Sequence, residues 1–420
     1  MLKHHSEQRS EVSKSLIDRR FLLLQGPSSF FFSDLGEALR ASGADVHKIG
    51  FCPGEWLYWR NTAGTYHPYR STMKEFPTFL AGFVADHRVS DIVMLGDGRK
   101  PHAAAVAAKQ QFGLTCRIWI VEHGYLRPSL ILIEAEGMGG ASLIPSKYDP
   151  SIRFDLEKEA LVWPASFARY AALDVTYHLA TVVAAPISYP HYRPHSGISP
   201  LREYAGWIGK ALRGTIGAKP REMVERRIAD HDGPVFLFPL QLSQDFQLTN
   251  YGTGEDQEAV LTRVVTSFQA HAPENALLIV KVHPLDNGLT RWDRLVADQR
   301  GNKPVLYLDG GDLTSLLTRA QGVVTINSTV GLAAIQSGCP TCVLGRAVYD
   351  LPGLTHETGL DQFWRLPIAP EPEMARNFVS YLRAVWHVPG AFDGPGSRAG
   401  AKALATWLGN PPNLSEVQSG

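Results

Sequence analysis

Short runs of apolar and β-branched residues recur along the first half of the chain, and polar residues follow each run. The runs cover residues 21–24, 45–51, 91–95 and 116–121, with helical spacing in the segments between them. Runs of this length that alternate with helices are typical of the buried strands of a parallel sheet. The pattern therefore predicts that the chain opens with a Rossmann-like α/β half.

The second half of the chain repeats this pattern with five further apolar runs. Strands are predicted at residues 235–241, 277–282, 305–308, 323–326 and 341–344, with helices at 256–271, 312–320 and 330–337. Five strands that alternate with helices predict a doubly wound parallel sheet. We expect an N-terminal Rossmann-like domain at 20–205, to which helices at about 372–408 return, and a C-terminal domain at 206–371.

The segments between the two predicted sheets are less regular. An aromatic and polar loop is expected at 54–70 and a helix at 164–184, followed by a connection rich in Pro and His. Residues 207–228 are rich in Lys and Arg, and Gly217 and Pro220 should divide them into two short helices. This stretch is either a solvated basic face or a contact with anionic lipid headgroups.

Composition narrows the class of protein. The formal net charge of the 420 residues is zero and the sequence pI is about 7.3, which argues against binding of nucleic acid through global charge. Cys339 and Cys342 have CxxC spacing, but no second Cys or His pair stands nearby, so structural thiols of a reducing compartment are expected. The N-terminus is polar, and no apolar run reaches the roughly 18 residues that span a bilayer. We therefore expect a cytoplasmic protein that can rest on a membrane surface.

One stretch, residues 322–349, organises the candidate chemistry. It predicts a strand–turn–helix–strand unit whose polar residues Asn327, Ser328 and Thr329 fall at the carboxyl end of the first strand. In open α/β sheets ligands bind at that edge, and the first amides of a helix can hold an anion. We interpret the unit as the phosphate-and-sugar end of a nucleotide-sugar site. The alternative is an ordinary helix cap in a structural βαβ unit.

Other polar clusters follow the predicted strands. Those of the first sheet are Gln25, Asp97, Arg99, His102, Glu122 and Arg127, and those of the second are Gln241, Gln244, Asp245, Lys281 and His283. Two Rossmann-like halves whose strand ends line one cleft describe a GT-B glycosyltransferase. No strong DxD pair favours metal-assisted chemistry, and the first loop lacks the GxGxxG pattern of dinucleotide sites. Lys281, His283, Ser328 and Thr329 have the chemistry to neutralise a phosphate instead.

Six motifs in order carry a family resemblance that covers residues 21–365. They are LQGPSSFFFSDLGEALRASGADVHKIGF, GDGRKPHAAA, EHGYLRPSLILIEAEG, PLQLSQDFQ, KVHP and TINSTVGLAAIQSGCPTCVLGRAVYDLPGLT. With them the chain resembles the capsular polysaccharide β-Kdo transferases of the KpsS and KpsC type, and most closely the single-module KpsS type. This resemblance implies a retaining GT-B enzyme that needs no cofactor and no metal.

The implied reaction moves the acidic sugar Kdo from CMP-β-Kdo to a (lyso)phosphatidylglycerol-type lipid, which starts the β-Kdo linker of a capsule. The implied partners are the CMP-sugar donor, an anionic lipid acceptor at the inner membrane surface and other capsule assembly proteins, with no nucleic acid. The enzyme would be cytoplasmic and peripheral on the inner membrane. Double displacement through two carboxylates and internal return both stay open as mechanisms.

The resemblance also assigns roles to residues. His283 and Ser328 would contact the CMP phosphate, Asp245 would be the catalytic carboxylate and Glu122 the acid/base. The other implied contacts are to the donor or its carboxylate, from Lys281, Asn327, Thr329, Gln241, Gln244, Arg127 and Arg346. Acceptor contacts are expected from Gln25, Asp97, Arg99 and His102.

Each assignment has a structural alternative. Asp245 can cap a helix, Glu122 can pair with Arg127, His283 can be a hydrogen-bonded histidine of the fold, and Asp97 and Arg99 can pair with each other. Ala333 stands where the family is expected to have Glu, and GDGR is a variant segment, so another CMP-linked ulosonic acid stays open as the donor. The functional alternatives are a GT-B transferase for another nucleotide sugar and a non-catalytic capsule assembly or export subunit that binds glycolipid.

Overall fold

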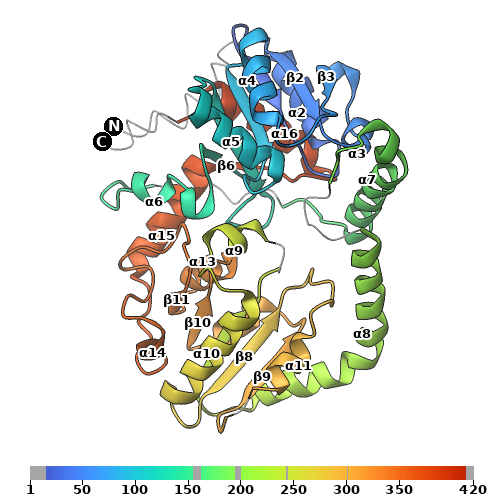
Figure 1. Cartoon of the computed structure of the whole chain (residues 1–420). Helices are drawn as coiled ribbons and strands as arrows, with labels where there is room; N and C mark the ends of the chain where they lie inside the picture. Colours follow the sequence, from blue (N-terminus) through green and yellow to red (C-terminus); the bar gives the residue numbers. More distant parts are fainter. Residues whose placement is uncertain (1–15, 155–161, 194–199, 243–244, 300, 413–420) are drawn as a thin grey trace. The chain divides into compact units, whose positions relative to one another are not determined.

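The chain divides into two compact units in the computed structural model (Figure 1), which describes residues 16–154, 162–193, 200–242, 245–299 and 301–412. The first unit comprises Met1–Met138, Leu156–His195 and Tyr381–Gly420, and the second comprises Gly139–Asp155 and Ser196–Ser380. The boundaries predicted from the sequence were 206 and 371 for the second domain. The short segment Gly139–Asp155, which belongs to the second unit, was placed in the first.

The first unit contains a seven-stranded sheet in the order β12-β6-β5-β4-β1-β2-β3. Its strands are β1 (Arg20–Leu23), β2 (Asp45–Gly50), β3 (Thr65–Pro68), β4 (Asp91–Leu95), β5 (Arg117–His123), β6 (Leu130–Ala135) and β12 (His387–Pro389). The first five are parallel, whereas β6 and β12 extend the sheet as antiparallel strands. The parallel order 3-2-1-4-5 is that of a Rossmann half, which confirms the predicted α/β class for this unit.

Helices cover this sheet on the pattern that the sequence predicts. α2 packs against the C-terminal helix α16, α4 against α5, and α3 against α7. The helices are α2 (Phe31–Ala41), α3 (Pro53–Leu57), η1 (Asn61–Ala63), α4 (Phe76–Asp86), α5 (Lys100–Phe112), α7 (Phe167–Ser188), η3 (Leu382–Trp386) and α16 (Gly396–Gly409). The expected return of C-terminal residues to the first domain is thus seen in α16, which belongs to this unit.

Three strands of the first sheet were not predicted: β3, β6 and β12, the last of which lies within residues 372–408 that were expected to be helical. The segment 54–70, expected to be a loop, contains α3 and the edge strand β3, which pairs with β2. The β3 sequence TYHP has no fully buried residue, so it lacks the apolar run by which the other strands were recognised. The antiparallel strand β6 was also missed, although all six of its residues are buried.

The second unit contains a five-stranded parallel sheet in the order β11-β10-β7-β8-β9, which is again the Rossmann order. Its strands are β7 (Val235–Pro239), β8 (Leu277–Val282), β9 (Val305–Asp309), β10 (Gly322–Thr325) and β11 (Thr341–Val343). Each lies within a residue or two of a predicted run. The prediction of a doubly wound five-stranded sheet is therefore confirmed.

Two apolar layers flank the second sheet. Phe268 and Trp364 lie in the layer under α10 and α11, and Leu316 and Ala334 lie in the layer under α8, α12 and α13. The helices of the unit are η2 (Gly139–Ala141), α6 (Ile144–Lys147), α8 (Pro200–Ala229), α9 (Phe246–Tyr251), α10 (Gln257–His271), α11 (Trp292–Ala297), α12 (Leu313–Arg319), α13 (Thr329–Gln336), α14 (Leu360–Phe363) and α15 (Pro372–Tyr381).

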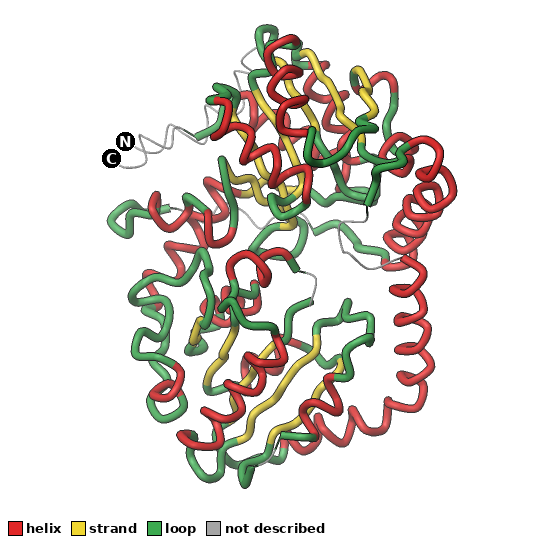
Figure 2. The backbone as a smooth tube through the Cα atoms, in the orientation of Figure 1, coloured by secondary structure: helices red, strands yellow, loops and turns green. Residues whose placement is uncertain are grey.

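The division of the basic stretch into two short helices is wrong, because Pro200–Ala229 forms one helix, α8 (Figure 2). An internal proline costs about 3 kcal/mol, and contacts elsewhere along a helix can offset that cost. Lys210 Nζ donates to the Asp286 carbonyl at 3.0 Å and lies 3.4 Å from the Asp309 carboxylate. Near the other end, Ile228 is buried in the core. Contacts on both sides of the break thus keep the helix continuous.

The helix α7, predicted at 164–184, runs from Phe167 to Ser188. Among the described helices of at least 18 residues, it is the one whose length and composition would suffice to cross a membrane. The sequence indicated no uninterrupted apolar run of that length, because Asp174 and His178 interrupt it.

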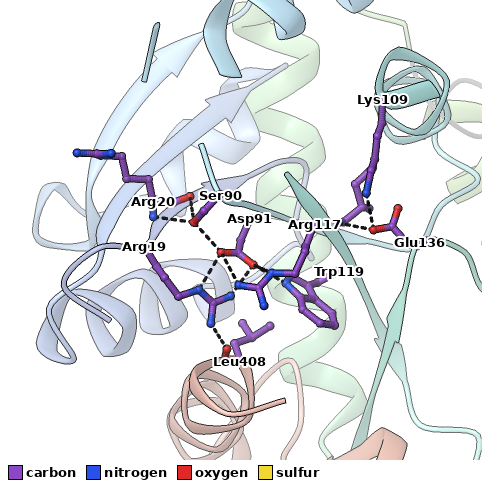
Figure 3. A network of polar contacts seen from close by, with 10 residues as sticks. Arg19, Arg20, Ser90, Asp91, Lys109, Arg117, Trp119, Glu136 and Leu408 are labelled. Carbon is purple, nitrogen blue, oxygen red and sulfur yellow. Dashed lines mark hydrogen bonds and ion pairs between the residues drawn. The ribbon is translucent and has the colours of Figure 1, made fainter. Parts of the chain in front are cut away.

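A buried carboxylate joins distant parts of the first unit (Figure 3). Asp91, at the start of β4, is fully buried and accepts hydrogen bonds from Arg19 Nε at 2.9 Å, Ser90 Oγ at 2.7 Å and Trp119 Nε1 at 2.8 Å. Arg117 Nε lies 3.0 Å from the same carboxylate, and Arg19 also donates to the Leu408 carbonyl of α16. Burial alone would raise the pKa of Asp91, but these hydrogen bonds outweigh it and hold the pKa below its ordinary value.

Replacing Asp91 by Asn should therefore lower the free energy of unfolding by about 2 kcal/mol or more, since two guanidinium groups lose their shared counter-charge. A depressed carboxyl pKa stabilises the fold above the unfolded-state pKa, and this stabilisation is lost as the pH falls through the folded-state pKa. Urea unfolding of wild type and variant should thus differ at neutral pH and converge in acid. Asp86→Asn, at an exposed position, is the control and should change stability by less than about 0.5 kcal/mol. An equal loss of unfolding free energy in Asp91→Asn and Asp86→Asn would show that the hydrogen bonds of the Asp91 carboxylate do not stabilise the first unit.

Candidate functional site

In the second sheet the strands on the two sides of β7 are reached by connections that run in opposite directions. β7 leads to β8 and β9 on one side, while β10 and β11 lie on the other. The loops that leave the carboxyl ends of β7 and β10 therefore diverge, and such a switch point is where open α/β sheets bind ligands. Gln241 follows β7 and Asn327 follows β10, so two of the predicted site residues lie at this point.

A reciprocal pair of amides closes the switch point. Gln241 Nε2 donates to Asn327 Oδ1 at 2.9 Å, and the Asn327 backbone N–H donates to Gln241 Oε1 at 3.2 Å. Asn327 Nδ2 donates to the Gln247 carbonyl at 2.8 Å. Gln257, which the sequence did not single out, holds the backbone of Gln241 through both its amide atoms. These contacts of Gln241 and Asn327 brace the loops, and their contact with substrate stays a prediction.

Ser328 caps α13 as predicted. Its Oγ accepts the Val330 N–H at 3.2 Å, while its own N–H donates to Thr325 Oγ1. The Tyr349 hydroxyl donates to the Ser328 carbonyl, and a Cβ on Gly331 would collide with that hydroxyl. Ser328 and Thr329 are half-buried. The first amides of a helix have no partner within it and carry its positive end, so this turn can hold an anion.

Lys281 and His283 lie at the carboxyl end of β8, the strand on the other side of β7 from β10. Lys281 is buried, and its Nζ donates to the Gly310 carbonyl at 2.6 Å. Burial lowers the pKa of this lysine, and the nearby Asp309 carboxylate partly opposes the shift. His283 is half-buried, and its Nδ1 accepts the Leu285 N–H at 3.1 Å, which fixes the proton on Nε2 in the neutral ring. The structural alternative for His283, a hydrogen bond within its own loop, is therefore present.

Asp245 is the N-cap of α9, where its Oδ1 accepts the Gln247 N–H at 2.9 Å. The capping alternative is thus confirmed as one role of Asp245, and its part in catalysis stays a prediction. Gln244 lies outside the described residues. Arg346 is exposed and donates to the Gly140 carbonyl of the same unit, and its contact with substrate stays a prediction.

The first unit has an equivalent switch point between β1 and β4. Gln25 follows β1 and is buried, and its Nε2 donates to the Tyr177 hydroxyl of α7 at 3.1 Å. Asp97 follows β4 and accepts the Met138 N–H at 3.1 Å, and Arg99 donates to the Gly26 carbonyl at 3.1 Å. Both ionic residues are thus tied to the backbone of neighbouring loops at this edge.

Glu122 and His102 lie beside the same loop. Glu122, near the end of β5, accepts the His123 N–H at 2.9 Å, and a Cβ on Gly96 would lie 3.3 Å from its Oε2. Burial raises the pKa of Glu122, although Arg99 and Arg127 partly oppose the shift.

His102 is fully buried, and its Nδ1 donates to the Gly96 carbonyl at 2.8 Å. Burial and the charge of Arg99 hold the pKa of His102 well below its ordinary value. The structure therefore brings Gln25, Asp97, Arg99, His102 and Glu122 to one edge.

The exposed Arg127 is not joined to Glu122 by an ion pair within the described part of the chain, so that alternative for Glu122 finds no support. Sequence reasoning also missed a buried ion pair between Lys48 and Glu55 close to this edge. Lys48 Nζ donates to the Leu24 carbonyl at 2.8 Å, and Glu55 accepts the Phe51 N–H at 2.8 Å. The sequence signal for this ion pair was Lys48 itself, because a lysine within a buried strand requires an acidic or carbonyl partner.

The two Rossmann-order units define an α/β protein of the GT-B class, as predicted. The model of the capsule polysaccharide biosynthesis protein family matches residues 90–392, and the chain belongs to that family. It is 30% identical to the capsule polysaccharide export protein KpsS of Escherichia coli over 89% of this chain and 97% of KpsS. It is also 30% identical to the capsule polysaccharide modification protein LipB of Neisseria meningitidis serogroup B, over 88% of this chain and 91% of LipB. Both findings confirm the resemblance stated from the motifs.

A solved structure of similar fold is the KpsC β-Kdo 2,7 transferase of Thermosulfurimonas dismutans. It matches with a TM-score of 0.44 and 13% identity, over 93% of this chain and 99% of that one.

Truncating Gln241 to Ala should destabilise the second unit by about 1–3 kcal/mol, because the Asn327 amide loses its partner at the switch point. The same change should weaken binding of CMP, since the turn before α13 loses its brace. Isothermal titration and urea unfolding measure the two effects. Gln336→Ala, at an exposed position on α13, is the matched control and should alter neither. Unchanged stability in Gln241→Ala would show that the amide pair does not hold the loops.

Proposed function

We propose that the protein is a retaining glycosyltransferase of capsule polysaccharide synthesis. It moves Kdo from CMP-β-Kdo to a (lyso)phosphatidylglycerol-type lipid at the cytoplasmic face of the inner membrane. The observation that carries this proposal is the switch point of the second unit. There, a capped helix N-terminus follows β10, and Lys281 and His283 lie at the carboxyl end of β8, with β7 between these two strands of one sheet. These groups suit a nucleotide phosphate without a metal ion.

In this proposal the second unit binds the CMP part of the donor. The backbone amide of Thr329, at the first position of α13, and the Nε2–H of His283 compensate the charge of the departing cytidylate. Lys281 contributes a buried positive charge at the same edge. Arg127, Lys281 or Arg346 binds the carboxylate that Kdo carries beside its anomeric carbon.

The first unit presents the acceptor. Glu122 has the property that an acid/base group needs, because its burial raises its pKa toward the pH at which proton transfer is useful. Asp245 attacks the anomeric carbon in the first step, and Glu122 takes the proton of the acceptor hydroxyl in the second. Membership in the capsule polysaccharide biosynthesis protein family supports a role of the reaction in capsule synthesis.

The direct test is release of CMP from CMP-Kdo in the presence of lyso-phosphatidylglycerol. Asp245→Asn should reduce kcat by at least about a thousandfold if the carboxylate is the nucleophile. Mass spectrometry of the enzyme after incubation with CMP-Kdo should show a Kdo adduct on Asp245. Asp256→Asn is the matched control, because Asp256 caps α10 as Asp245 caps α9. A similar loss in both variants would mean that Asp245 acts only as a cap.

The pH dependence tests Glu122. A general base must be ionised, so kcat should fall as the pH drops through the raised pKa of Glu122, above the ordinary glutamate range. Glu122→Gln should lower kcat and remove this acidic limb from the profile. Glu136→Gln, an exposed glutamate one strand further on, should leave the profile unchanged. An acidic limb that persists in Glu122→Gln would assign the titration to another group.

The name of one relative, a capsule polysaccharide export protein, favours a second candidate, a subunit that binds glycolipid without turnover. Saturable glycolipid binding with no CMP release from any nucleotide sugar would favour this candidate. Thermal stabilisation by UDP or GDP in place of CMP would instead indicate a transferase with another donor.

A further inference from the structure

The two long faces of α7 differ sharply. The inner face carries the buried residues Tyr177, Thr181 and Ala185 and packs against α3. The outer face carries exposed aliphatic residues, whose exposed fractions range from 44% at Val175 to 90% at Ile187. They are Val175, Leu179, Val182, Val183 and Ile187. Their spacing places them on one stripe of the helix. We call these five residues the α7 stripe.

Exposed cations flank the α7 stripe at the two ends of its helix. Asp174 is only partly exposed and lies 3.6 Å from His178 on the same helix. The charged residue that α7 does expose is Arg169 in its first turn, and the exposed Arg193 follows its last turn. Among the described residues, the stripe thus has exposed cations at both ends of its helix and one partly exposed acid, Asp174. This arrangement complements a lipid surface with an apolar interior and anionic headgroups.

Hydrogen bonds on the inner face show that α7 is part of the folded unit. The Gly54 N–H donates to Thr181 Oγ1 at 3.1 Å, and the Tyr58 hydroxyl donates to the Leu173 carbonyl at 2.9 Å. The Cys52 thiol donates to the Tyr177 hydroxyl at 3.0 Å. A transmembrane position would break these bonds, whereas a helix lying in the interface would keep them and bury only its outer face.

The same helix reaches the edge where acceptor binding is proposed. Gln25, at the switch point of the first sheet, donates to the Tyr177 hydroxyl at 3.1 Å. α3, which packs on α7, exposes Trp56 and Leu57, and tryptophan is enriched where proteins meet the bilayer interface. The apolar surface of the first unit is thus built on the helix that also holds its acceptor edge.

We propose that the α7 stripe docks the protein on the surface of an anionic lipid bilayer. The aliphatic side chains enter the interface between headgroups and acyl chains, and the cations at the two ends of α7 contact lipid phosphates. The connection of this surface with acceptor recognition rests on the proposed function, whereas the docking itself does not.

The test is co-sedimentation of the full chain with vesicles, in the absence of any nucleotide sugar. Wild type should bind vesicles of phosphatidylcholine and phosphatidylglycerol more tightly than vesicles of phosphatidylcholine alone. The double variant Leu179→Asp/Val183→Asp should bind the mixed vesicles at least roughly tenfold more weakly, because two aliphatic groups no longer enter the interface. The control Leu366→Asp/Ile368→Asp changes two exposed aliphatic residues of the second unit and should bind as wild type does. Thermal unfolding verifies that each variant is folded.

Four results would overturn the proposal. The first is wild-type protein that stays in the supernatant, and the second is equal vesicle binding by wild type and the α7 double variant. The third is a dimer in lipid-free solution that the α7 variant dissociates, which would make the stripe a contact between copies of the chain. Loss of binding only in Arg226→Ala/Arg227→Ala would assign the lipid contact to the basic helix α8 instead, and would also overturn it.

A second assay separates this proposal from the proposed function. CMP release with detergent-dispersed lyso-phosphatidylglycerol should be the same in wild type and in the α7 double variant, because that acceptor needs no bilayer. Vesicle binding through α7 without CMP release would refute the transfer reaction alone. CMP release from the dispersed acceptor without vesicle binding would refute only the docking.

Discussion

Reversal of strand order beside the first strand is the constraint on which both units depend. The loops that leave the carboxyl ends of the two central strands run in opposite directions. Their backbone N–H and C=O groups therefore need hydrogen-bond partners outside the sheet. In the second unit the Gln241–Asn327 amide pair closes this gap from within the sheet itself. In the first unit the equivalent Gln25 reaches out of the sheet to Tyr177 on α7. The loops at the switch point are thus held by side chains of the sheet's own loops in the second unit, and by a contact with the helix α7 in the first unit.

Desolvation shapes the chemistry at the edge of the first sheet. Burial raises the pKa of Glu122 and lowers the pKa values of Lys48 and His102, so each of the three shifts favours the neutral form. Lys48 keeps a partner in Glu55, and His102 donates to the Gly96 carbonyl. Glu122 has no such ionic partner among the described residues, and for this reason it is the group of this edge best suited to exchange a proton.

The sequence was informative where burial alone determines structure. Buried runs such as Leu277–Val282 predicted strands to within a residue or two, because a parallel strand must be apolar on both faces. β3 escaped because its TYHP sequence is half exposed, and α8 was misjudged because contacts with Asp286 and Asp309 compensate for its proline. At the site, the cap formed by Ser328 was predictable from local sequence. The Gln25–Tyr177 contact spans 152 positions, and no local pattern could reveal it.

The composition of α7 and its contacts in the folded unit indicate different relations to a membrane. Its composition would suit a membrane-crossing segment, yet Tyr177 and Thr181 join it to α3 and to the loop after β1. Because those polar contacts are all on one side, the helix can offer its other side to a bilayer without losing any of them. The lipid acceptor of the proposed function requires that the acceptor edge be brought to the membrane without opening the core. A helix bound to that edge on one face and apolar on the other meets both requirements.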